Sequence, residues 1–298
     1  MIFKFLKRAL AFVGFATTAV AAPSPVLAPA ARPALWQVSD PDTTVYLFGT
    51  IHILPENYRW ETPKIQKAVA NSNELYVETI VDPKKPTELI AALTSMGYSK
   101  GLPPIADRVA PAKRPLLEAA IAKSGIPRTT FDGMETWAAA FTLLGVQYRS
   151  IGLAGENGVE QTLKDQFGGA GKPIGQLETN TEQLAFFDKL PEVAQRSLLE
   201  GSIETSTTAS GEFSDMLRAW VTGDVGLIAR TFNQDLSSTP ELREALLDRR
   251  NANWSRWIQQ RMQKPGTIMI AVGAGHLAGS DSVLARLESA GYRVKRIQ

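Results

Sequence analysis

The chain contains no cysteine among its 298 residues and only two histidines, His52 and His276. The lack of cysteine excludes disulfides, thiolate-bound metal sites and a cysteine nucleophile. Blocks of like charge are also missing, and there is no basic stripe of the kind that binds nucleic acid. We therefore expect no nucleic-acid partner, and we expect any metal or acid–base site to be built without thiols.

Long hydrophobic runs are scarce, and the one near the start of the chain is short. Residues 1–21 begin with basic side chains, continue into an apolar run and end in small residues, which is typical of a secretory signal. The apolar run is too short for a comfortable membrane span. We predict a signal peptide at 1–21, and hence a periplasmic or secreted protein without a stable membrane span after cleavage. An uncleaved amino-terminal anchor is the alternative.

The rest of the chain has the composition of an ordinary globular protein. Without the leader it carries 29 basic and 30 acidic residues, a net charge of about −1. Residues 22–34 are rich in alanine and proline, which predicts an extended linker. Residues 35–298 are numerous enough to bury a large core without disulfides. We predict that they form a single domain.

Strands alternating with helices predict an α/β fold with a mixed, largely parallel central sheet and flanking helices. Two stretches, at about 82–148 and 181–264, are mainly helical in pattern, and prolines divide the first of them into short helices. The first stretch shows no catalytic motif, and we predict that it forms a lid or a wall. We predict that both stretches are helical insertions.

Each histidine follows a predicted buried strand and lies in a turn that contains glycine. The strand at 45–48 leads into residues 49–52 (Gly-Thr-Ile-His), and the strand at 267–272 leads into residues 273–276 (Gly-Ala-Gly-His). Open α/β sheets bind ligands beyond the carboxyl ends of their strands. The two turns contain every histidine of the protein, so the pattern indicates that both histidines belong to one site.

Two glutamates occupy the same kind of position. Glu78 lies near the end of a predicted strand at 75–80, and Glu178 directly follows one at 172–177. An unpaired carboxylate on a buried central strand is costly, which favours a functional role for Glu78; a solvated glutamate at a sheet edge is the alternative. Glu156, at the end of a short predicted strand, is a further candidate for this group.

Arg250 and Asn251 interrupt the apolar face of a helix that is predicted to begin at Pro240. Burying an arginine without an acidic partner is expensive. One interpretation is a structural salt bridge from Arg250 to one of the glutamates. The other is that Arg250 and Asn251 point into an active cleft and bind a substrate carboxylate or an oxyanion. Both interpretations place acidic groups opposite this helix.

Two histidines and several carboxylates, with no thiols, suit a first-row divalent metal that could activate water for hydrolysis. The chain has no H-E-x-x-H motif, so spacing alone does not establish a metal site. A metal-free site is also chemically reasonable, with one histidine as general base, a glutamate to orient it and Arg250 to stabilise the oxyanion. A serine hydrolase is disfavoured because no G-x-S-x-G elbow is present.

These residues together resemble the TraB/GumN family, from about Trp36 to Ile297. The stretches that carry the resemblance are 49–52 with Leu54 and Pro55, Glu78, 177–179 with Gln183, 250–251, and 272–277. The family is similar to the Tiki metalloproteases and, more distantly, to erythromycin esterases and ChaN-like haem-binding lipoproteins. The resemblance implies an α/β core with helical insertions and a divalent-metal peptidase. The segment 155–160 resembles a family stretch that often carries aspartate where Glu156 stands.

From the residues and the resemblance we predict a metal-dependent, Tiki-like hydrolase that acts on a peptide or protein substrate. His52, Glu78 and His276 are the predicted ligands of manganese, cobalt or zinc, and both histidines are also predicted to be catalytic. Glu178 is the predicted general base or a further ligand, and the pair at 250–251 is predicted to bind substrate. The alternative of another class is a non-catalytic periplasmic protein that binds a peptide or a haem-like ligand.

Overall fold

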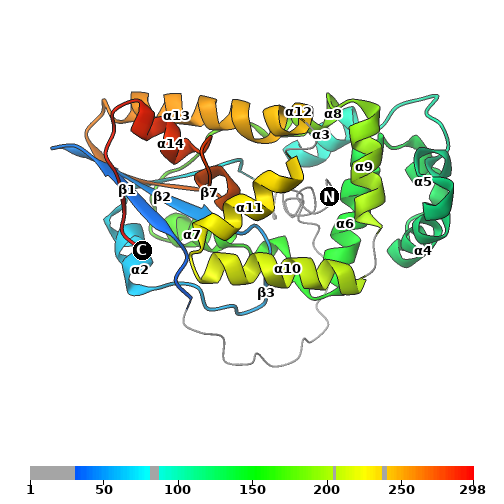
Figure 1. The fold of residues 1–298 in the computed structure, drawn as a ribbon, viewed down its shortest axis with the longest axis horizontal. Coiled ribbons are helices and arrows are strands. Elements are labelled where there is room, and N and C mark those ends of the chain that lie inside the picture. The colour runs from blue at the N-terminus through cyan, green and yellow to red at the C-terminus, as the bar shows by residue number, and fades with distance from the viewer. Residues whose placement is uncertain (1–30, 81–86, 204–205, 237–239) are drawn as a thin grey trace.

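The computed structural model of the chain describes residues 31–80, 87–203, 206–236 and 240–298. A six-stranded sheet lies toward one end of the molecule, and helices cover it and continue to the other end (Figure 1). Within the described ranges no helix is both long enough and apolar enough to cross a membrane. The signal peptide predicted at the start of the chain lies outside these ranges.

The strands form one large sheet of order β6-β4-β7-β2-β1-β8 and a small sheet that pairs β3 with β5. In the large sheet β6, β4, β7 and β2 are parallel neighbours, and β1 is antiparallel to both β2 and β8. This confirms the predicted α/β fold with a mixed, largely parallel sheet. The strand bounds are Leu35–Ser39 (β1), Thr43–Thr50 (β2), Leu54–Pro55 (β3), Glu74–Val77 (β4), Leu153–Ala154 (β5), Ile174–Gln176 (β6), Gly266–Gly273 (β7) and Val294–Arg296 (β8).

The helices connect the strands and make up most of the remaining structure. The α-helices are Pro63–Asn71 (α2), Thr87–Met96 (α3), Arg114–Ser124 (α4), Arg128–Gly133 (α5), Thr136–Ser150 (α6), Val159–Gly169 (α7), Asn180–Asp188 (α8), Glu192–Ser202 (α9), Ser206–Val221 (α10), Val225–Leu236 (α11), Pro240–Arg243 (α12), Arg249–Arg261 (α13) and Val283–Ser289 (α14). Short 3₁₀ turns span Ile105–Arg108 (η1), Pro111–Lys113 (η2), Gly155–Asn157 (η3) and Ala274–Leu277 (η5), and a π-helical turn spans Glu244–Asp248 (η4).

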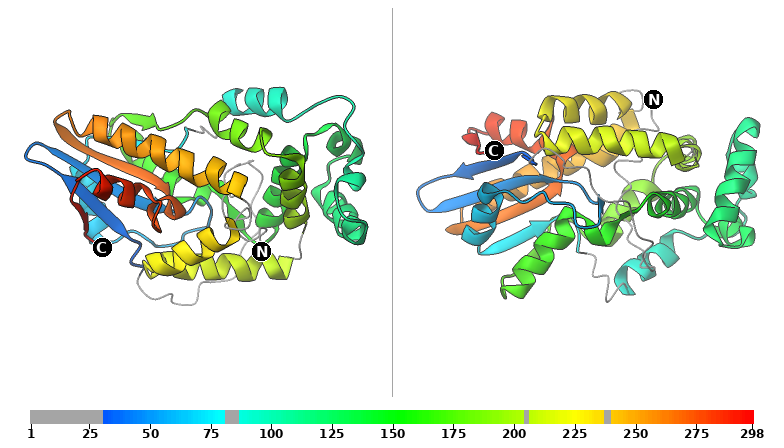
Figure 2. Two further views of the ribbon diagram at one scale, coloured as in Figure 1. Left: turned by 45° about the horizontal axis from the view of Figure 1, so that its top comes forward. Right: turned by 90° about the horizontal axis from the view of Figure 1, so that it is seen from below.

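The two faces of the sheet bury different rows of side chains, because successive residues of a strand point to opposite faces. In β7, Ile268 and Ile270 pack with α13 and α14, whereas Met269 and Ala271 belong to the larger core on the other face. That second face also carries α2 and α7 (Figure 2). The sheet is therefore the middle of three layers, and the central strand β7 is buried on both sides.

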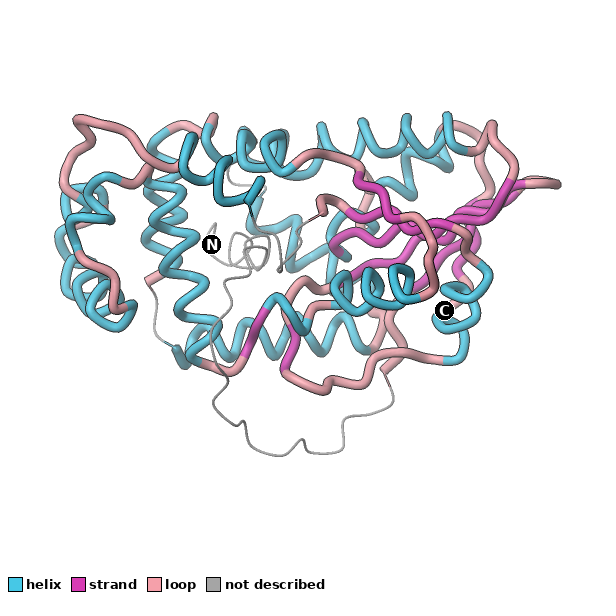
Figure 3. Tube along the Cα trace, turned by 180° about the vertical axis from the view of Figure 1, so that it is seen from behind, coloured by secondary structure: helices cyan, strands magenta, loops and turns pink. Residues whose placement is uncertain are grey.

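The stretches predicted to be helical insertions contain α3 to α6 and α8 to α13. Helices α3 to α6 and α8 to α11 make up a helical part that lies beyond the carboxyl ends of the parallel strands (Figures 2 and 3). Trp220 of α10 donates an indole hydrogen bond to the carbonyl oxygen of Gly49 (2.8 Å) and thereby ties this part to the end of β2. The helical part consequently borders the edge of the sheet at which the predicted site residues emerge.

Local signals set several element ends as predicted. The Thr62 side chain accepts a hydrogen bond from the Ile65 N–H and starts α2 with a proline in its first turn. Thr179 and Glu182 form a complete capping box at the start of α8. Because that cap begins α8 immediately after Glu178, it fixes the point at which the chain leaves β6.

Other boundaries differ from the predictions. Strand β1 was not predicted, and it adds an antiparallel strand between β2 and the terminal strand. The strand expected at 75–80 ends at Val77, since the Glu78 side chain and the following residues bond to other elements. Most of the predicted linker lies outside the described residues; at its carboxyl end Ala34 is buried, and the Arg32 N–H donates to the Val221 carbonyl (2.6 Å).

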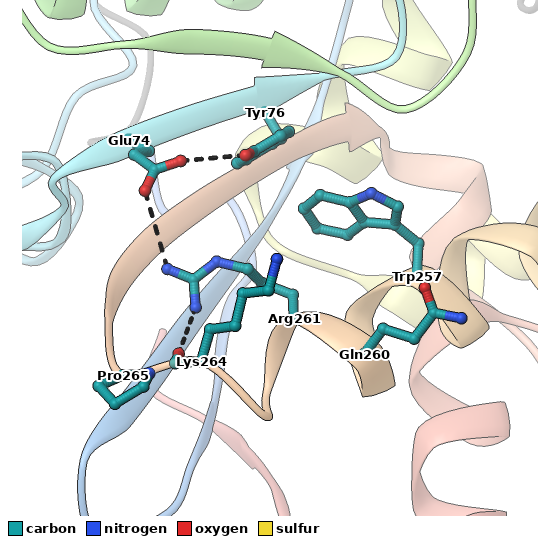
Figure 4. Close-up of a pocket in the computed structure, with 7 residues that line it drawn as sticks. All are labelled: Glu74, Tyr76, Trp257, Gln260, Arg261, Lys264 and Pro265. Carbon is teal, nitrogen blue, oxygen red and sulfur yellow. Dashed lines mark hydrogen bonds and ion pairs between the residues drawn. The ribbon is translucent and has the colours of Figure 1, made fainter.

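A groove of about 470 Å³ lies at the opposite, amino-terminal end of β4, against the last turn of α13 (Figure 4). The rings of Tyr76 and Trp257 meet at 4.5 Å between centroids, and the Tyr76 hydroxyl donates to Glu74 (3.0 Å). Arg261 lies 3.9 Å from the same carboxylate. These contacts join the start of β4 to the end of α13, the same strand and helix that carry the candidate site at their other ends.

Candidate functional site

Four side chains singled out from the sequence meet at the carboxyl edge of the sheet. His52, Glu78, Glu178 and His276 come just after β2, β4, β6 and β7 in the chain. These four strands are parallel and adjacent, so their carboxyl ends lie side by side. The topology brings together residues that are up to 224 positions apart in the chain.

Glu78 is the centre of this group. Its side chain is 3% exposed, and Oε1 accepts a hydrogen bond from the Gly273 N–H at the end of β7 (2.7 Å). Oε2 accepts from Nη2 of Arg250 (2.6 Å). Oε1 also lies 3.8 Å from Nε2 of His52 and 3.9 Å from Nε2 of His276. One carboxylate oxygen thus lies nearly equidistant from the two imidazoles.

The surroundings of Glu78 keep it ionised. Burial by itself would raise the pKa of its carboxyl, but the charge of Arg250, assisted by the two histidines and the Gly273 amide, lowers that pKa to about 2. A carboxylate that remains charged at neutral pH is able to bind a cation.

His276 is held on both of its ring nitrogens. Nδ1 lies 2.7 Å from Oδ1 of Asn251, whose Nδ2 donates to the Asp281 carbonyl (3.0 Å), and Nε2 lies 3.1 Å from Nη1 of Arg250. Because the amide oxygen only accepts and the guanidinium only donates, Nδ1 carries the hydrogen and Nε2 the lone pair. Burial, together with the charge of Arg250, lowers the pKa of His276 to about 3, so the ring is neutral.

His52 is paired with a residue that the sequence analysis did not select. Its Nδ1 lies 2.6 Å from Oε1 of Glu160, in the first turn of α7, and its side chain is 13% exposed. The Thr50 hydroxyl donates to the same carboxylate oxygen. Burial would lower the pKa of His52, but Glu160 and, to a smaller extent, Glu78 outweigh it and raise that pKa.

Glu156, the further candidate for the site, is exposed on η3. The relevant glutamate of the stretch 155–160 is Glu160, one helical turn further on. Gly158, two residues before Glu160, is the feature of the sequence that relates this stretch to His52. A Cβ at position 158 would lie 2.1 Å from the His52 carbonyl oxygen. Only glycine permits so close an approach of two backbones, and this approach brings the start of α7 to His52.

Arg250 links the acidic and the histidine side chains. Its Nε donates to Glu178 (3.0 Å), Nη2 to both Glu78 and Glu178, and Nη1 to the Leu246 carbonyl (3.3 Å) and toward His276. All five N–H groups of the guanidinium are therefore engaged. The acidic groups expected opposite this helix are Glu78 and Glu178, as the structural salt-bridge interpretation requires.

The predicted apolar face of the helix is also present. Leu242, Leu246, Arg250 and Trp254 are all buried, although the π-helical turn η4 lies within this row. The Arg250 guanidinium lies 4.6 Å from the Trp254 ring, which also packs on His276 at 4.5 Å between ring centroids. A π-turn adds one residue to a helical turn, and such turns are frequent at functional sites.

Glu178 is buried between Arg250 and Gln183. Its two oxygens accept from the guanidinium, and Oε1 also accepts from Nε2 of Gln183 (3.0 Å). Burial raises its pKa, with a further contribution from nearby Glu78, although Arg250 acts in the opposite direction. The two carboxylates that share one arginine thus have pKa values displaced in opposite directions, a pattern typical of acid–base pairs.

The donor set suits a divalent metal. Two imidazoles and a carboxylate are a known ligand set for catalytic zinc, with bonds of about 2.1 Å. Glu78 Oε1 lies 3.8 Å from Nε2 of His52 and 3.9 Å from Nε2 of His276, and an ion with bonds of that length fits between the oxygen and either nitrogen. A Cβ on Gly273 would stand 3.1 Å from His52 Nε2 and 3.2 Å from Glu78 Oε1, and the glycine leaves that space open. In the described part of the chain, however, no three histidine, aspartate or glutamate side chains form a preassembled metal-binding group.

Comparison with known proteins places the chain among sequences of one family. The model of the TraB/PrgY/gumN family matches residues 34–296. The chain is 24% identical over 243 residues to uncharacterised protein YbaP of Escherichia coli (strain K12), covering 80% of this chain and 85% of that protein. The YbaP protein of Shigella flexneri matches with the same identity and coverage. No solved structure matches the chain.

Proposed function

The chain belongs to the TraB/PrgY/gumN family, and we propose that it is a metal-dependent hydrolase that cleaves peptide bonds at the carboxyl edge of its sheet. The observation that carries the proposal is the position of Glu78 Oε1, 3.8 and 3.9 Å from the Nε2 atoms of His52 and His276. We propose a peptide substrate because the family resembles the Tiki metalloproteases.

The proposed ligands are Nε2 of His52, Oε1 of Glu78 and Nε2 of His276, for manganese, cobalt or zinc. A divalent ion bound there would lower the pKa of water and polarise a substrate carbonyl at neutral pH. Asn251 serves this site by holding the hydrogen on Nδ1 of His276, which leaves the lone pair on Nε2. Arg250 offsets the charge of the buried carboxylates and keeps them in place.

Glu178 is the proposed general base. Burial raises its pKa, and Arg250 and Gln183 fix its orientation. Substrate binding by Arg250, as expected from the sequence, requires one of its present contacts to be exchanged for a substrate oxygen. We therefore propose that Arg250 and Asn251 act first by positioning the site, and that substrate contact by Arg250 follows when a peptide enters.

A peptide-library assay with metal exchange tests this function. We expect hydrolysis by purified mature protein reloaded with manganese, cobalt or zinc, loss of hydrolysis with a chelator, and recovery on reloading. Glu78→Gln removes a charged ligand at nearly constant volume and should abolish the recovery, whereas Glu156→Gln, on the exposed η3 turn, should behave as wild type. Absence of any product from the library under all metals would contradict the proposal.

A metal-free hydrolase is the second candidate, and one contact favours it. Nη1 of Arg250 lies 3.1 Å from His276 Nε2, the nitrogen that a metal needs. In that reaction His52 is the general base and Arg250 stabilises the oxyanion. This candidate predicts full activity in the presence of chelators. A binding protein for a peptide or haem-like ligand predicts, in contrast, tight binding and no product.

Export is part of the proposal. The segment at 1–21 is expected to direct the protein to the periplasm or the medium, where a peptide or protein substrate is available. Amino-terminal sequencing of protein recovered from the periplasmic fraction tests cleavage after Ala21. An intact leader found in the membrane fraction would instead support an amino-terminal anchor.

A further inference from the structure

The carboxylate of Glu160 and Nδ1 of His52 form one of the shortest contacts in the site, at 2.6 Å. An ionised carboxylate is only an acceptor, so Nδ1 must be the nitrogen that carries hydrogen, and in the neutral ring the lone pair then lies on Nε2. Nε2 is the nitrogen that lies 3.8 Å from Glu78. The contact thus selects which nitrogen of His52 is available for chemistry.

Glu160 is itself held firmly by the start of α7. The Thr50 hydroxyl donates to its Oε1, and the Val159 N–H donates to the Ile51 carbonyl (3.1 Å). Gly158 allows the backbone to pass close to His52. These contacts hold the turn that carries His52 against the start of the helix that carries Glu160.

The other histidine is held in a similar way on its Nδ1, although its Nε2 also lies 3.1 Å from Nη1 of Arg250. Nδ1 of His276 meets Oδ1 of Asn251 at 2.7 Å, and its Nε2 lies 3.9 Å from Glu78 Oε1. Each imidazole thus has an oxygen acceptor on Nδ1 and directs Nε2 toward the same carboxylate. Carboxylate or carbonyl partners of this kind commonly set the tautomer and ring orientation of metal-binding histidines.

We infer that Glu160 is a positioning residue that holds His52 in the Nδ1–H tautomer and directs its Nε2 toward Glu78, as Asn251 does for His276. The inference rests on the proposed function in assigning a reactive or ligand role to Nε2. Removal of the acceptor should release the His52 ring and allow the Nε2–H form, which free imidazole side chains favour.

Nitrogen-15 NMR of the two histidines tests this directly, since the chain has only two. At a pH where His52 is neutral, wild type should show the Nδ1–H form. Glu160→Ala should move His52 toward the Nε2–H form and leave His276 unchanged, and Glu160→Gln, which keeps an acceptor oxygen, should retain the wild-type tautomer. Glu156→Ala, on the same segment, is the matched control. An unchanged His52 tautomer in Glu160→Ala overturns the inference.

Metal titration gives a second readout. With manganese, cobalt or zinc as the probe, Glu160→Ala should weaken binding by about 10- to 100-fold, the usual cost of losing such a partner. Equal affinity of wild type and Glu160→Ala would also overturn the inference. If wild type binds none of these metals, the proposed metal-dependent function fails, while the NMR result still decides the role of Glu160.

Discussion

Arg250 provides the sharpest test of how the site is held together. Its guanidinium is the shared partner of Glu78 and Glu178, whose side chains are 3% and 7% exposed. Arg250→Met removes the charge and all five N–H groups and keeps much of the side-chain volume. Both carboxylates are then left buried without their cation.

The expected cost follows from that burial. Removing one partner of a buried ion pair typically destabilises a protein by about 3–5 kcal/mol, since an uncompensated charge remains inside. For a domain of this size each kcal/mol corresponds to roughly 2–4 °C, so the melting temperature should fall by about 10 °C. Urea unfolding should show a lower midpoint with an unchanged slope.

An exposed arginine on the same chain provides the control. Arg196 pairs with Glu192 at 2.9 Å, but their side chains are 40% and 46% exposed, so Arg196→Ala should cost less than about 1 kcal/mol. Adding Glu178→Gln to Arg250→Met should restore part of the lost stability by removing one stranded charge. If Arg250→Met costs no more than Arg196→Ala, the account of Arg250 as the link between the carboxylates is wrong.

Three further predictions concern the residues around the histidines. The pKa of Glu78 is about 2 in the folded protein against an ordinary value of 4.5. The ionised carboxylate therefore stabilises the fold above pH 4.5, and this stabilisation is lost as the pH falls toward 2. The free energy of unfolding in urea should depend less on pH across this range in Glu78→Gln than in wild type. Gly273→Ala places a methyl group 3.1 Å from His52 Nε2, so metal affinity measured by titration should fall. Gly158→Ala forces the backbone away from the His52 carbonyl and should lower stability by about 1–3 kcal/mol in thermal unfolding; an unaltered melting temperature would show that this close approach is not required.

The sequence predicted which side chains meet at the edge of the sheet because the ends of strands can be recognised in it. His52, Glu78, Glu178 and His276 each lie near the end of a predicted strand or just after one, and parallel strands bring their carboxyl ends to one edge. Helical periodicity likewise placed Arg250 on a buried row. Family membership, suggested by the same residues, is confirmed. These signals are local in the chain. The general rules of α/β topology are enough to infer from them which residues meet at one edge of the sheet.

The missed features depend on contacts between distant segments. Glu160 begins a helix rather than ending a strand, and only the docking of α7 against the turn after β2 brings it to His52, 108 positions away in the chain. Strand β1 was missed because its five residues follow directly on the alanine- and proline-rich stretch and are defined by pairing on both edges. The sequence also left two interpretations of Arg250 open, a salt bridge and substrate binding. Weighing them requires the positions of its partners, and helical periodicity does not give those positions.

The central claim is that His52 and His276 act together, with Glu78 between them, on one divalent ion. Elemental analysis of purified mature protein, after reloading with manganese, cobalt or zinc, tests it most directly beside His52→Ala and His276→Ala. We predict near-stoichiometric metal in wild type and loss of it in both variants, each shown to be folded by circular dichroism. Wild-type protein that holds no metal after reloading, or variants that retain it, would contradict the claim.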